Sequence, residues 1–387
     1  MVNIAFTGGG TGGHIYPGLA VIAHLEKRLP PQSCRIFWIG SKTGMDRALV
    51  EEAGLEFFGV PAGRLRRYFS LKTIPDMFRV LTGYFAARAI LKRERPVLLF
   101  SKGGFVSVPP CAAAASLDIP VFTHESDYSP GLATRINIRF AAKTGGRVFA
   151  AYEDTAKALS GAAKTLKGAG RNFSARDLVT VSGNPVRPEF RNADPARGRA
   201  FLGLTRGERI LLVLGGSQGA RELNELVRLS LARLTESYVV VHQTGKGNEG
   251  DLAPGERYRV YPYFRDEMSH VLAAAELVLS RSGAGTVWES AAAGRPMVLV
   301  PLSGRGTRGD QVENARFFEK AGAAVVLADG DAVPGRLAET VARLAADGKR
   351  RDAMAEASAK TGKSDGAERI AAMLAEFAGF PPAEGQP

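Results

Sequence analysis

The stretch VNIAFTGGGTGG, residues 2–13, joins an apolar run directly to a glycine-rich turn, and ILLVLGGSQGA, residues 210–220, repeats this arrangement. A helical pattern follows the glycines in both places, so each stretch predicts a buried strand, a tight turn and a helix, the unit from which parallel sheets are built. The series of strands therefore restarts about 210 residues along the chain. The sequence predicts an α/β protein with two doubly wound, Rossmann-like domains.

Short β-branched runs extend both series. We expect strands over residues 2–7, 35–40, 97–100, 120–123, 179–182, 210–215, 238–243, 277–280 and 297–301. Proline and charge interrupt the pattern from Gly183 to Arg199, so we expect domains of residues 1–186 and 187–387, with a last helix that can pack back on the first domain. Ligands are expected in the cleft between the domains, at the carboxyl ends of both sheets.

The composition of the 387 residues, 45% hydrophobic and 23% charged, is that of a globular protein and excludes a disordered chain. The two cysteines, Cys34 and Cys111, are too few for a disulfide framework or a cysteine-rich zinc site, so we expect a reducing compartment. The longest charge-free apolar stretch, residues 103–117, is interrupted by two prolines and is too short to cross a bilayer. We therefore expect a chain that is neither secreted nor integral to a membrane.

The net charge of +12 is concentrated in the first half: residues 1–190 hold 25 Lys and Arg against 14 Asp and Glu, whereas residues 191–387 hold 26 against 25. Within that half, nine Lys and Arg alternate with apolar and aromatic residues from Arg64 to Arg95. This pattern favours an anionic membrane surface as partner, although a core-packed helix with a solvated cationic face would have the same pattern. Because no recognised RNA- or DNA-binding motif is present, we expect no nucleic-acid partner.

The glycine-rich turns are the first candidate binding sites. Neither is a P-loop or has GxGxxG spacing, but N–H groups at a helix N-terminus favour an anion, and Ser217 can donate to a diphosphate. The alternative is that the glycines serve only the turn. A third candidate is SRSGAGTVWESAAAGRP, residues 280–296, where Glu289 lies in the first turns of a helix and can accept two ribose hydroxyls or simply complement the helix N-terminus.

Six motifs in order, at residues 8–20, 101–109, 124–127, 183–187, 215–221 and 280–296, resemble those of the MurG family. Its members are peripheral membrane enzymes that transfer N-acetylglucosamine (GlcNAc) from UDP-GlcNAc to the muramoyl 4-hydroxyl of undecaprenyl-diphospho-muramoyl-pentapeptide (lipid I), forming lipid II in peptidoglycan synthesis. The resemblance runs from Val2 to about Ala324. It implies a GT-B fold on the cytoplasmic face of the cell membrane, with the acceptor handled by the first domain and UDP-GlcNAc held by the second.

The resemblance also implies which residues bind substrates. Glu289 would hold the ribose, Gln311 would contact the GlcNAc hydroxyls with the support of Asn314, and the backbone at Phe264 and Arg265 would contact uracil. The expected substrate-binding residues are Thr11, Gly12, Gly13, Asp127, Arg187, Ser217, Phe264, Arg265, Ala284, Gly285, Thr286, Val287, Trp288, Glu289, Gln311 and Asn314. The chain departs from the commonest family pattern at Ser126-Asp127, which stands in place of Gln-Asn, and Asp310 stands where some members have glutamine.

The implied reaction inverts the anomeric carbon and needs a base for the acceptor hydroxyl. His14 is the first candidate because it follows the glycine loop and can titrate near neutral pH, although it could instead orient that loop; Glu125 and Asp127 are the rivals. Asp329-Gly-Asp331 is expected to be a turn, and we expect neither a metal nor a cofactor. A diacylglycerol glycosyltransferase and a UDP-GlcNAc epimerase of the same fold remain as alternatives.

Overall fold

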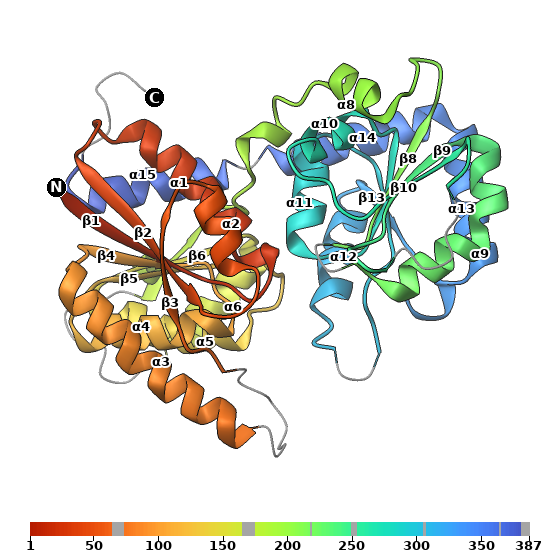
Figure 1. The fold of residues 1–387 in the computed structure, drawn as a ribbon. Helices are drawn as coiled ribbons and strands as arrows, with labels where there is room; N and C mark the ends of the chain where they lie inside the picture. Colours follow the sequence, from red (N-terminus) through yellow and green to blue (C-terminus); the bar gives the residue numbers. More distant parts are fainter. Residues whose placement is uncertain are drawn as a thin grey trace. The chain divides into compact units, whose positions relative to one another are not determined.

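The computed structural model describes residues 1–63, 73–164, 175–216, 219–248, 254–304, 307–363 and 365–380. The chain forms two compact units: unit 1 comprises Met1–Pro185 and Asp365–Pro387, and unit 2 comprises Val186–Ser364 (Figure 1). Each unit is built on one parallel sheet, with strand order β3-β2-β1-β4-β5-β6-β7 in unit 1 and β10-β9-β8-β11-β12-β13 in unit 2. The predicted α/β class with two doubly wound sheets is confirmed.

The elements of unit 1 alternate between strands and helices. They are β1 (Val2–Thr7), η1 (Gly12–His14), α1 (Tyr16–Arg28), β2 (Cys34–Ser41), α2 (Asp46–Glu52), β3 (Glu56–Val60), α3 (Thr73–Glu94), β4 (Leu98–Ser101), η2 (Phe105–Ser107), α4 (Val108–Ser116), β5 (Val121–Glu125), α5 (Leu132–Thr144), β6 (Val148–Ala150), α6 (Glu153–Lys164), α7 (Ala175–Leu178), β7 (Val179–Val181) and α15 (Gly366–Phe377).

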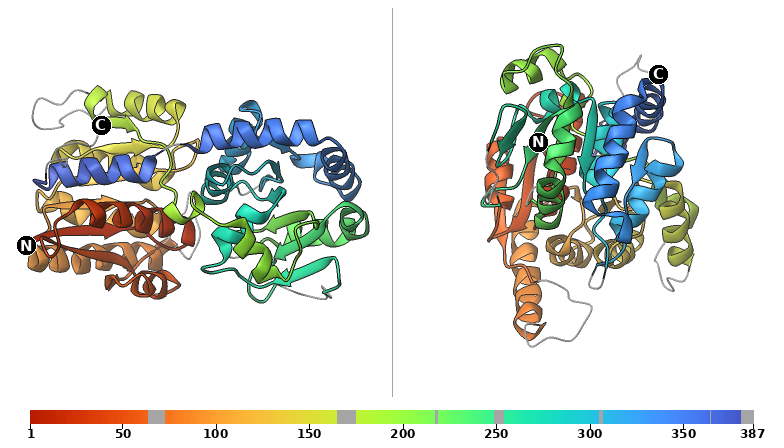
Figure 2. Two further views of the ribbon diagram at one scale, coloured as in Figure 1. Left: turned by 90° about the horizontal axis from the view of Figure 1, so that it is seen from above. Right: turned by 90° about the vertical axis from the view of Figure 1, so that its right-hand side faces the viewer.

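Helices cover both faces of the unit 1 sheet. Successive residues of a strand point to opposite faces, so neighbouring residues pack in different clusters. Ile4 and Phe6 pack in one buried cluster with residues of α1 and α15, whereas Ala5 packs in another with residues of α3 and α4. Helix α15, from the end of the chain, lies beside α1 (Figures 1 and 2). The last helix therefore completes the core of unit 1.

Unit 2 repeats the alternation. Its elements are η3 (Pro188–Phe190), α8 (Pro195–Leu202), β8 (Ile210–Leu214), α9 (Arg221–Ser237), β9 (Val239–Gln243), β10 (Tyr258–Tyr261), α10 (Met268–Ala274), β11 (Leu277–Ser280), α11 (Ala284–Ala292), β12 (Met297–Leu299), α12 (Asp310–Lys320), β13 (Ala324–Val326), η4 (Asp329–Asp331), α13 (Pro334–Ala346) and α14 (Gly348–Gly362). The predicted turn at Asp329–Asp331 is confirmed as η4.

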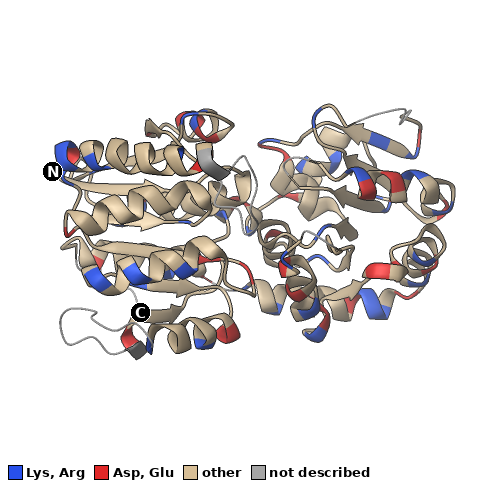
Figure 3. Ribbon diagram, turned by 90° about the horizontal axis from the view of Figure 1, so that it is seen from below, with Lys and Arg blue, Asp and Glu red and all other residues tan. Residues whose placement is uncertain are grey.

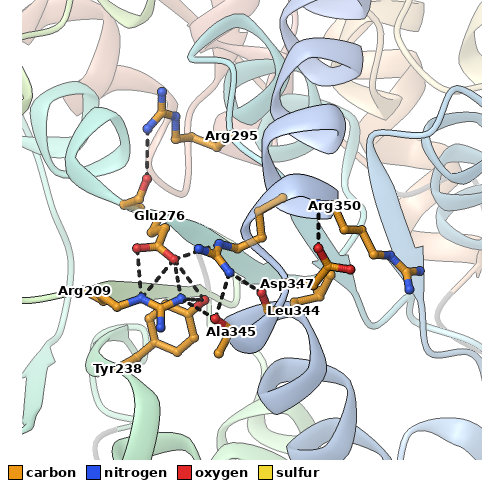
Figure 4. A network of polar contacts seen from close by, with 10 residues as sticks. Arg209, Tyr238, Glu276, Arg295, Leu344, Ala345, Asp347 and Arg350 are labelled. Atoms are coloured by element: carbon orange, nitrogen blue, oxygen red, sulfur yellow. Dashed lines mark hydrogen bonds and ion pairs between the residues drawn. The ribbon is translucent and has the colours of Figure 1, made fainter.

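A polar network holds the amino ends of β8 and β11 to the C-terminal helices of unit 2 (Figure 4). The carboxylate of Glu276 accepts hydrogen bonds from Arg209 (Nη2–Oε1 2.6 Å) and pairs with Arg351 (Nε–Oε1 2.8 Å). Both guanidinium groups also donate to the carbonyl of Ala345. The network lies at the amino ends of β8 and β11, so it does not involve the carboxyl ends of these strands.

Four strands lie outside the ranges that the sequence predicted: β3, β6, β10 and β13. Three of them, β3, β10 and β13, lie at a sheet edge, and β6 lies next to one. Each of the four has at most five residues, so its local pattern is weak. In the part of the chain that the structure describes, no helix combines the length and the apolar character needed to cross a membrane.

Candidate functional site

A pocket of about 340 Å³ opens in unit 2 at the carboxyl ends of β8 and β11. These two strands are neighbours in the sheet, and the chain leaves them in opposite directions across it, which is where doubly wound folds bind ligands. The lining residues come from the loops after β8, β11 and β12 and from the helices that follow: Gly215, Gly216, Gly219, Ala220, Arg221, Glu222, Arg281, Gly283, Thr286, Leu302 and Gln311.

Three helices begin at this pocket. The N-cap residues of α9, α11 and α12 are Ala220, Gly283 and Gly309. None of these residues has a side-chain oxygen that could accept a hydrogen bond from the first N–H groups of its helix. The N–H groups and the positive ends of three helix dipoles therefore favour an anionic ligand, such as a diphosphate.

Arg281 adds a fixed positive charge to the pocket wall. Its Nη1 donates to the carbonyl oxygens of Val300 (3.2 Å) and Pro301 (3.3 Å), and its Nη2 pairs with Glu222 Oε2 (2.5 Å). The Arg281 side chain is 12% exposed, whereas that of Glu222 is 77% exposed. A phosphate entering the pocket can thus replace the exposed carboxylate without moving the guanidinium group.

Gln311 and Asn314 are held by the loops that follow β11 and β12. The side-chain oxygen of Gln311 accepts a hydrogen bond from the N–H of Leu302 (2.9 Å). The backbone carbonyl of Gln311 accepts one from Ser282 Oγ (2.7 Å). The Asn314 amide donates to the Ser282 carbonyl (3.2 Å) and is buried. Gln311 therefore lines the pocket, whereas Asn314 is buried beside Ser282.

Glu289 and Arg187 form an ion pair 102 residues apart in the chain. Glu289 Oε1 accepts from Arg187 Nη2 (2.9 Å) and Nε (3.1 Å), and the two side chains are 20% and 19% exposed. The guanidinium carbon of Arg187 also lies 4.6 Å from the centroid of the Phe190 ring. Burial raises the pKa of Glu289, and the charge of Arg187 opposes this increase. Glu289, the residue expected to bind the ribose, thus uses one carboxylate oxygen to pair with Arg187, which is also expected in the donor site.

The other expected donor residues differ in accessibility. Phe264 is 2% exposed, and its N–H donates to Gln243 Oε1 (2.9 Å). Trp288 packs against Phe317 and Phe318, and Val287 is fully buried, so their side chains belong to the core of unit 2. Ala284 and Gly285 begin α11 with Thr286, and the carbonyl of Arg265 accepts from Met268. The expected residue Ser217 lies outside the described residues.

In unit 1 the glycine loop after β1 is held by a buried carboxylate. Asp46 Oδ1 accepts from the N–H of Gly10 (2.9 Å), and Oδ2 accepts from the N–H of Ser41 (3.0 Å). A Cβ at Gly9 would lie 1.9 Å from Asp46 Oδ2, so no other residue fits there. Burial raises the pKa of Asp46, and the two N–H donors oppose this increase. Asp46 thus fixes the loop that leads to Thr11, Gly12 and Gly13.

His14 ends the short helix η1, where its N–H donates to the Thr11 carbonyl (3.1 Å). Its half-buried ring lies against the loop after β4: a Cβ at Gly104 would lie 2.9 Å from His14 Cδ2. Strands β1 and β4 are neighbours at the switch point of the unit 1 sheet. The structure therefore brings the first base candidate to the position in unit 1 that corresponds to the pocket in unit 2.

The rival bases are placed differently from each other. Both oxygens of Glu125 accept backbone N–H bonds, Oε1 from Asp127 (3.0 Å) and Oε2 from Gly131 (2.8 Å). Glu125 is buried, and burial together with the charge of Asp127 raises its pKa. This carboxylate therefore holds the loop that precedes α5, whereas Asp127 itself is only half-buried in that loop.

Helix α3 carries exposed apolar residues on one side. Met77, Phe78, Leu81 and Phe85 are 64%, 66%, 53% and 61% exposed. At about 100° per residue they lie within a stripe about 100° wide, and Arg88 and Lys92 continue this stripe toward the end of the helix. Lys and Arg occur on helices of both units, interspersed with Asp and Glu (Figure 3). The first part of the predicted segment, residues 64–72, lies outside the described residues.

Among the residues that the structure describes, no three or more His, Cys, Asp or Glu side chains form a group that could hold a metal ion. The carboxylates of Asp329 and Asp331 belong to the exposed turn η4.

Comparison with known proteins agrees with this geometry. Residues 4–145 match the glycosyltransferase family 28 N-terminal domain, and residues 210–370 match the family 28 C-terminal domain. The UDP-N-acetylglucosamine--N-acetylmuramyl-(pentapeptide) pyrophosphoryl-undecaprenol N-acetylglucosamine transferase of Treponema denticola is 48% identical over 354 residues, 86% of each chain. The enzyme of the same name from Treponema pallidum is 44% identical and covers 97% of this chain and 95% of its own length. The chain belongs to the MurG family of glycosyltransferases.

Solved structures agree with the fold of this family. Acinetobacter baumannii MurG matches with a TM-score of 0.69 at 24% identity, over 97% of this chain and 100% of its own. A UDP-GlcNAc 2-epimerase from Neisseria meningitidis bound to UDP-GlcNAc matches with a TM-score of 0.67 at 15% identity, over 97% and 100% of the two chains. The fold is GT-B, as predicted.

Three residues that line the pocket or hold the loops of the site were not among those expected from the sequence: Arg281, Asp46 and Lys102. Arg281 directly follows the last residue of β11, and Lys102 directly follows the last residue of β4. A charged residue at the carboxyl end of a strand, one or two residues before a glycine, was the signal that could have identified both. Asp46 carried no such signal, since its partner Gly10 lies 36 residues away.

Proposed function

We propose that this chain transfers GlcNAc from UDP-GlcNAc to the muramoyl residue of lipid I, forming lipid II with release of UDP. The names of its relatives, which are up to 48% identical to it, support this reaction. The observation that carries the proposal is the unit 2 pocket, where three helix N-termini and Arg281 face one space.

The pocket is suited to the donor diphosphate. As the bond between the sugar and UDP breaks, negative charge develops on the leaving phosphate, and fixed N–H donors and an arginine stabilise that charge without reorganisation. Gln311 would contact the GlcNAc hydroxyls from the same wall. Oε1 of Glu289 is held by Arg187, so its second oxygen would accept from the ribose.

The acceptor hydroxyl attacks C1 from the side opposite UDP, and the anomeric carbon is inverted. His14 would take the hydroxyl proton, because it follows the glycine loop held by Asp46 and its ring is half-buried at the switch point of unit 1. Asp127 would accept a hydrogen bond from a sugar hydroxyl but could not donate one, unlike the asparagine of the commonest family pattern.

The test is transfer of labelled sugar from UDP-GlcNAc and from UDP-glucose to lipid I and to diacylglycerol. We expect labelled lipid II and stoichiometric UDP only with UDP-GlcNAc and lipid I. Label on diacylglycerol would instead make the chain a different lipid glycosyltransferase. Conversion of UDP-GlcNAc to its epimer without release of UDP would make it an epimerase.

We further propose that the α3 stripe brings unit 1 to the cytoplasmic face of the cell membrane, because lipid I does not leave the bilayer. The apolar residues of the stripe would enter the interface, and each well-placed cation would add about 1 kcal/mol with anionic lipid. Replacing Phe78 and Phe85 with serine and Arg88 and Lys92 with glutamine should abolish sedimentation with anionic vesicles.

The matched control for this variant is Leu229→Ser, since Leu229 is 56% exposed on α9 of unit 2. We expect the control to sediment like the parent protein, and binding of the parent to weaken with salt. The stripe variant should lose transfer to full-length lipid I but keep transfer to a short-chain, water-soluble acceptor. Unchanged vesicle binding, or equal loss on both acceptors, would assign the stripe a purely structural role.

A further inference from the structure

Lys102 is only 2% exposed, although lysine is almost never buried without a partner. Its Nζ donates to Ser126 Oγ (2.6 Å), and Ser126 Oγ donates in turn to Asn184 Oδ1 (2.6 Å). Lys102 follows β4, Ser126 follows β5 and Asn184 lies after β7. One chain of hydrogen bonds therefore joins three loops at the carboxyl edge of the unit 1 sheet.

The charges around Lys102 explain how it is accommodated. Burial lowers its pKa to about 8, although the carboxylates of Glu125 and Asp127 oppose this decrease. The adjacent His124 is buried and donates from Nε2 to the Gly183 carbonyl (3.0 Å), and its pKa lies well below the usual value because of burial and the charge of Lys102. His14 packs on the glycines that follow Lys102. At neutral pH this cluster thus contains an ammonium group, two carboxyl groups and a neutral His124.

A protonated lysine is what this particular loop requires. Asp127 lies two residues after the buried Glu125, and its N–H donates to Glu125 Oε1 (3.0 Å), so this loop places a second carboxylate beside the first. Two carboxylates this close repel each other and favour protonation of one of them. An ammonium group within hydrogen-bond reach of the intervening serine offsets that repulsion.

We propose that Lys102 is a positioning residue for the transfer reaction, whose ammonium group fixes Ser126 and holds the carboxylate of Asp127 in place to accept a hydrogen bond from a sugar hydroxyl. The inference rests on the proposed function, because it assigns Lys102 a part in the same site. Lys102 does not touch the reacting atoms in this proposal. It acts through the loop after β5.

A double-mutant cycle on kcat/KM for GlcNAc transfer tests the proposal, with Lys102→Met, Asp127→Asn and the two combined. Lys102→Met should lower kcat/KM about tenfold or more, and its effect should be several-fold smaller in the Asp127→Asn background, where there is no charge to offset. The matched control is Lys157→Met, since Lys157 is 73% exposed on α6, and we expect it to behave as the parent protein. If the effects of the two substitutions on kcat/KM simply multiply, the two residues act independently and the proposal is overturned.

The pH profile gives a second, independent readout. Activity of the parent protein should fall as the pH rises above about 8, where Lys102 loses its proton. Lys102→Arg, which stays protonated, should retain transfer and move this alkaline limb to higher pH. If the alkaline limb of Lys102→Arg lies at the same pH as that of the parent protein, the proposal is overturned. This outcome holds even if Lys102→Met fails to fold, which circular dichroism of the same preparations would show. Absence of GlcNAc transfer by the parent protein would refute the proposed function, whereas transfer with an unmoved limb would refute this inference alone.

Discussion

The substitution Asp46→Asn tests how the glycine loop of unit 1 is held. The two carboxylate oxygens of Asp46 each accept one buried N–H, from Gly10 and from Ser41. In asparagine one oxygen becomes an NH₂ group, which would face an N–H donor, so one hydrogen bond is lost and one buried N–H is left unsatisfied. A hydrogen bond to a charged group contributes about 1.5–3 kcal/mol, and an unsatisfied buried donor costs about 1–3 kcal/mol. Part of this loss is offset because the variant no longer buries a charge. We therefore expect the free energy of unfolding of unit 1 to be about 2–4 kcal/mol lower in the variant.

The pH dependence of this effect has a definite sign. Burial raises the pKa of Asp46 above its ordinary value of 3.8, so the folded state binds the proton more tightly than the unfolded state. The contribution of this titration to stability is therefore fully present below the unfolded pKa and is lost as the pH rises through the folded pKa. Because asparagine does not titrate, the difference in stability between the parent protein and Asp46→Asn should decrease as the pH rises through that range.

Trp38 provides the assay, since its indole N–H donates to the carbonyl of Gly8 in the same loop (3.0 Å). In a Trp288→Phe background, fluorescence during urea unfolding reports on Trp38 in unit 1 alone. The control is Asp118→Asn, since Asp118 is exposed and its positive φ of 53° is a conformation that asparagine also adopts. Asp46→Asn should also lower kcat, because the loop that leads to His14 loosens. An unfolding midpoint and a kcat equal to those of the control would refute this account of the loop.

Two further predictions concern the proposed substrate residues. Glu289→Gln should weaken UDP-GlcNAc binding by about 1–3 kcal/mol in calorimetry, because the variant removes the carboxylate charge that pairs with Arg187 and loses an acceptor for the ribose; unchanged affinity would remove Glu289 from the donor site. His14→Ala should lower kcat about 10²–10⁴-fold with little change in donor affinity if His14 is the base, whereas an equal loss of binding and turnover would mean that His14 only orients the loop.

The sequence by itself determined the α/β class, the repeat of two doubly wound sheets and the position of both glycine loops. It could do so because a buried parallel strand is a continuous apolar run, and because the turns that follow β1 and β8 need glycine where the backbone approaches other groups closely, as at Gly9 against Asp46. These signals are local, so they survive without knowledge of the partner segments. The short strands β3, β6, β10 and β13 carry too few residues to produce such a signal.

The tertiary structure alone decided which side chains meet. The pairs Arg187 with Glu289, Asp46 with Gly10 and Lys102 with Ser126 join residues 102, 36 and 24 positions apart. Helix α15 likewise returns to pack on α1. No spacing in the sequence predicts these contacts, because each depends on the order of the strands in its sheet and on which helix covers which face. The sequence therefore identified the loops of the site, whereas only the packing of distant elements determined which charges hold those loops in place.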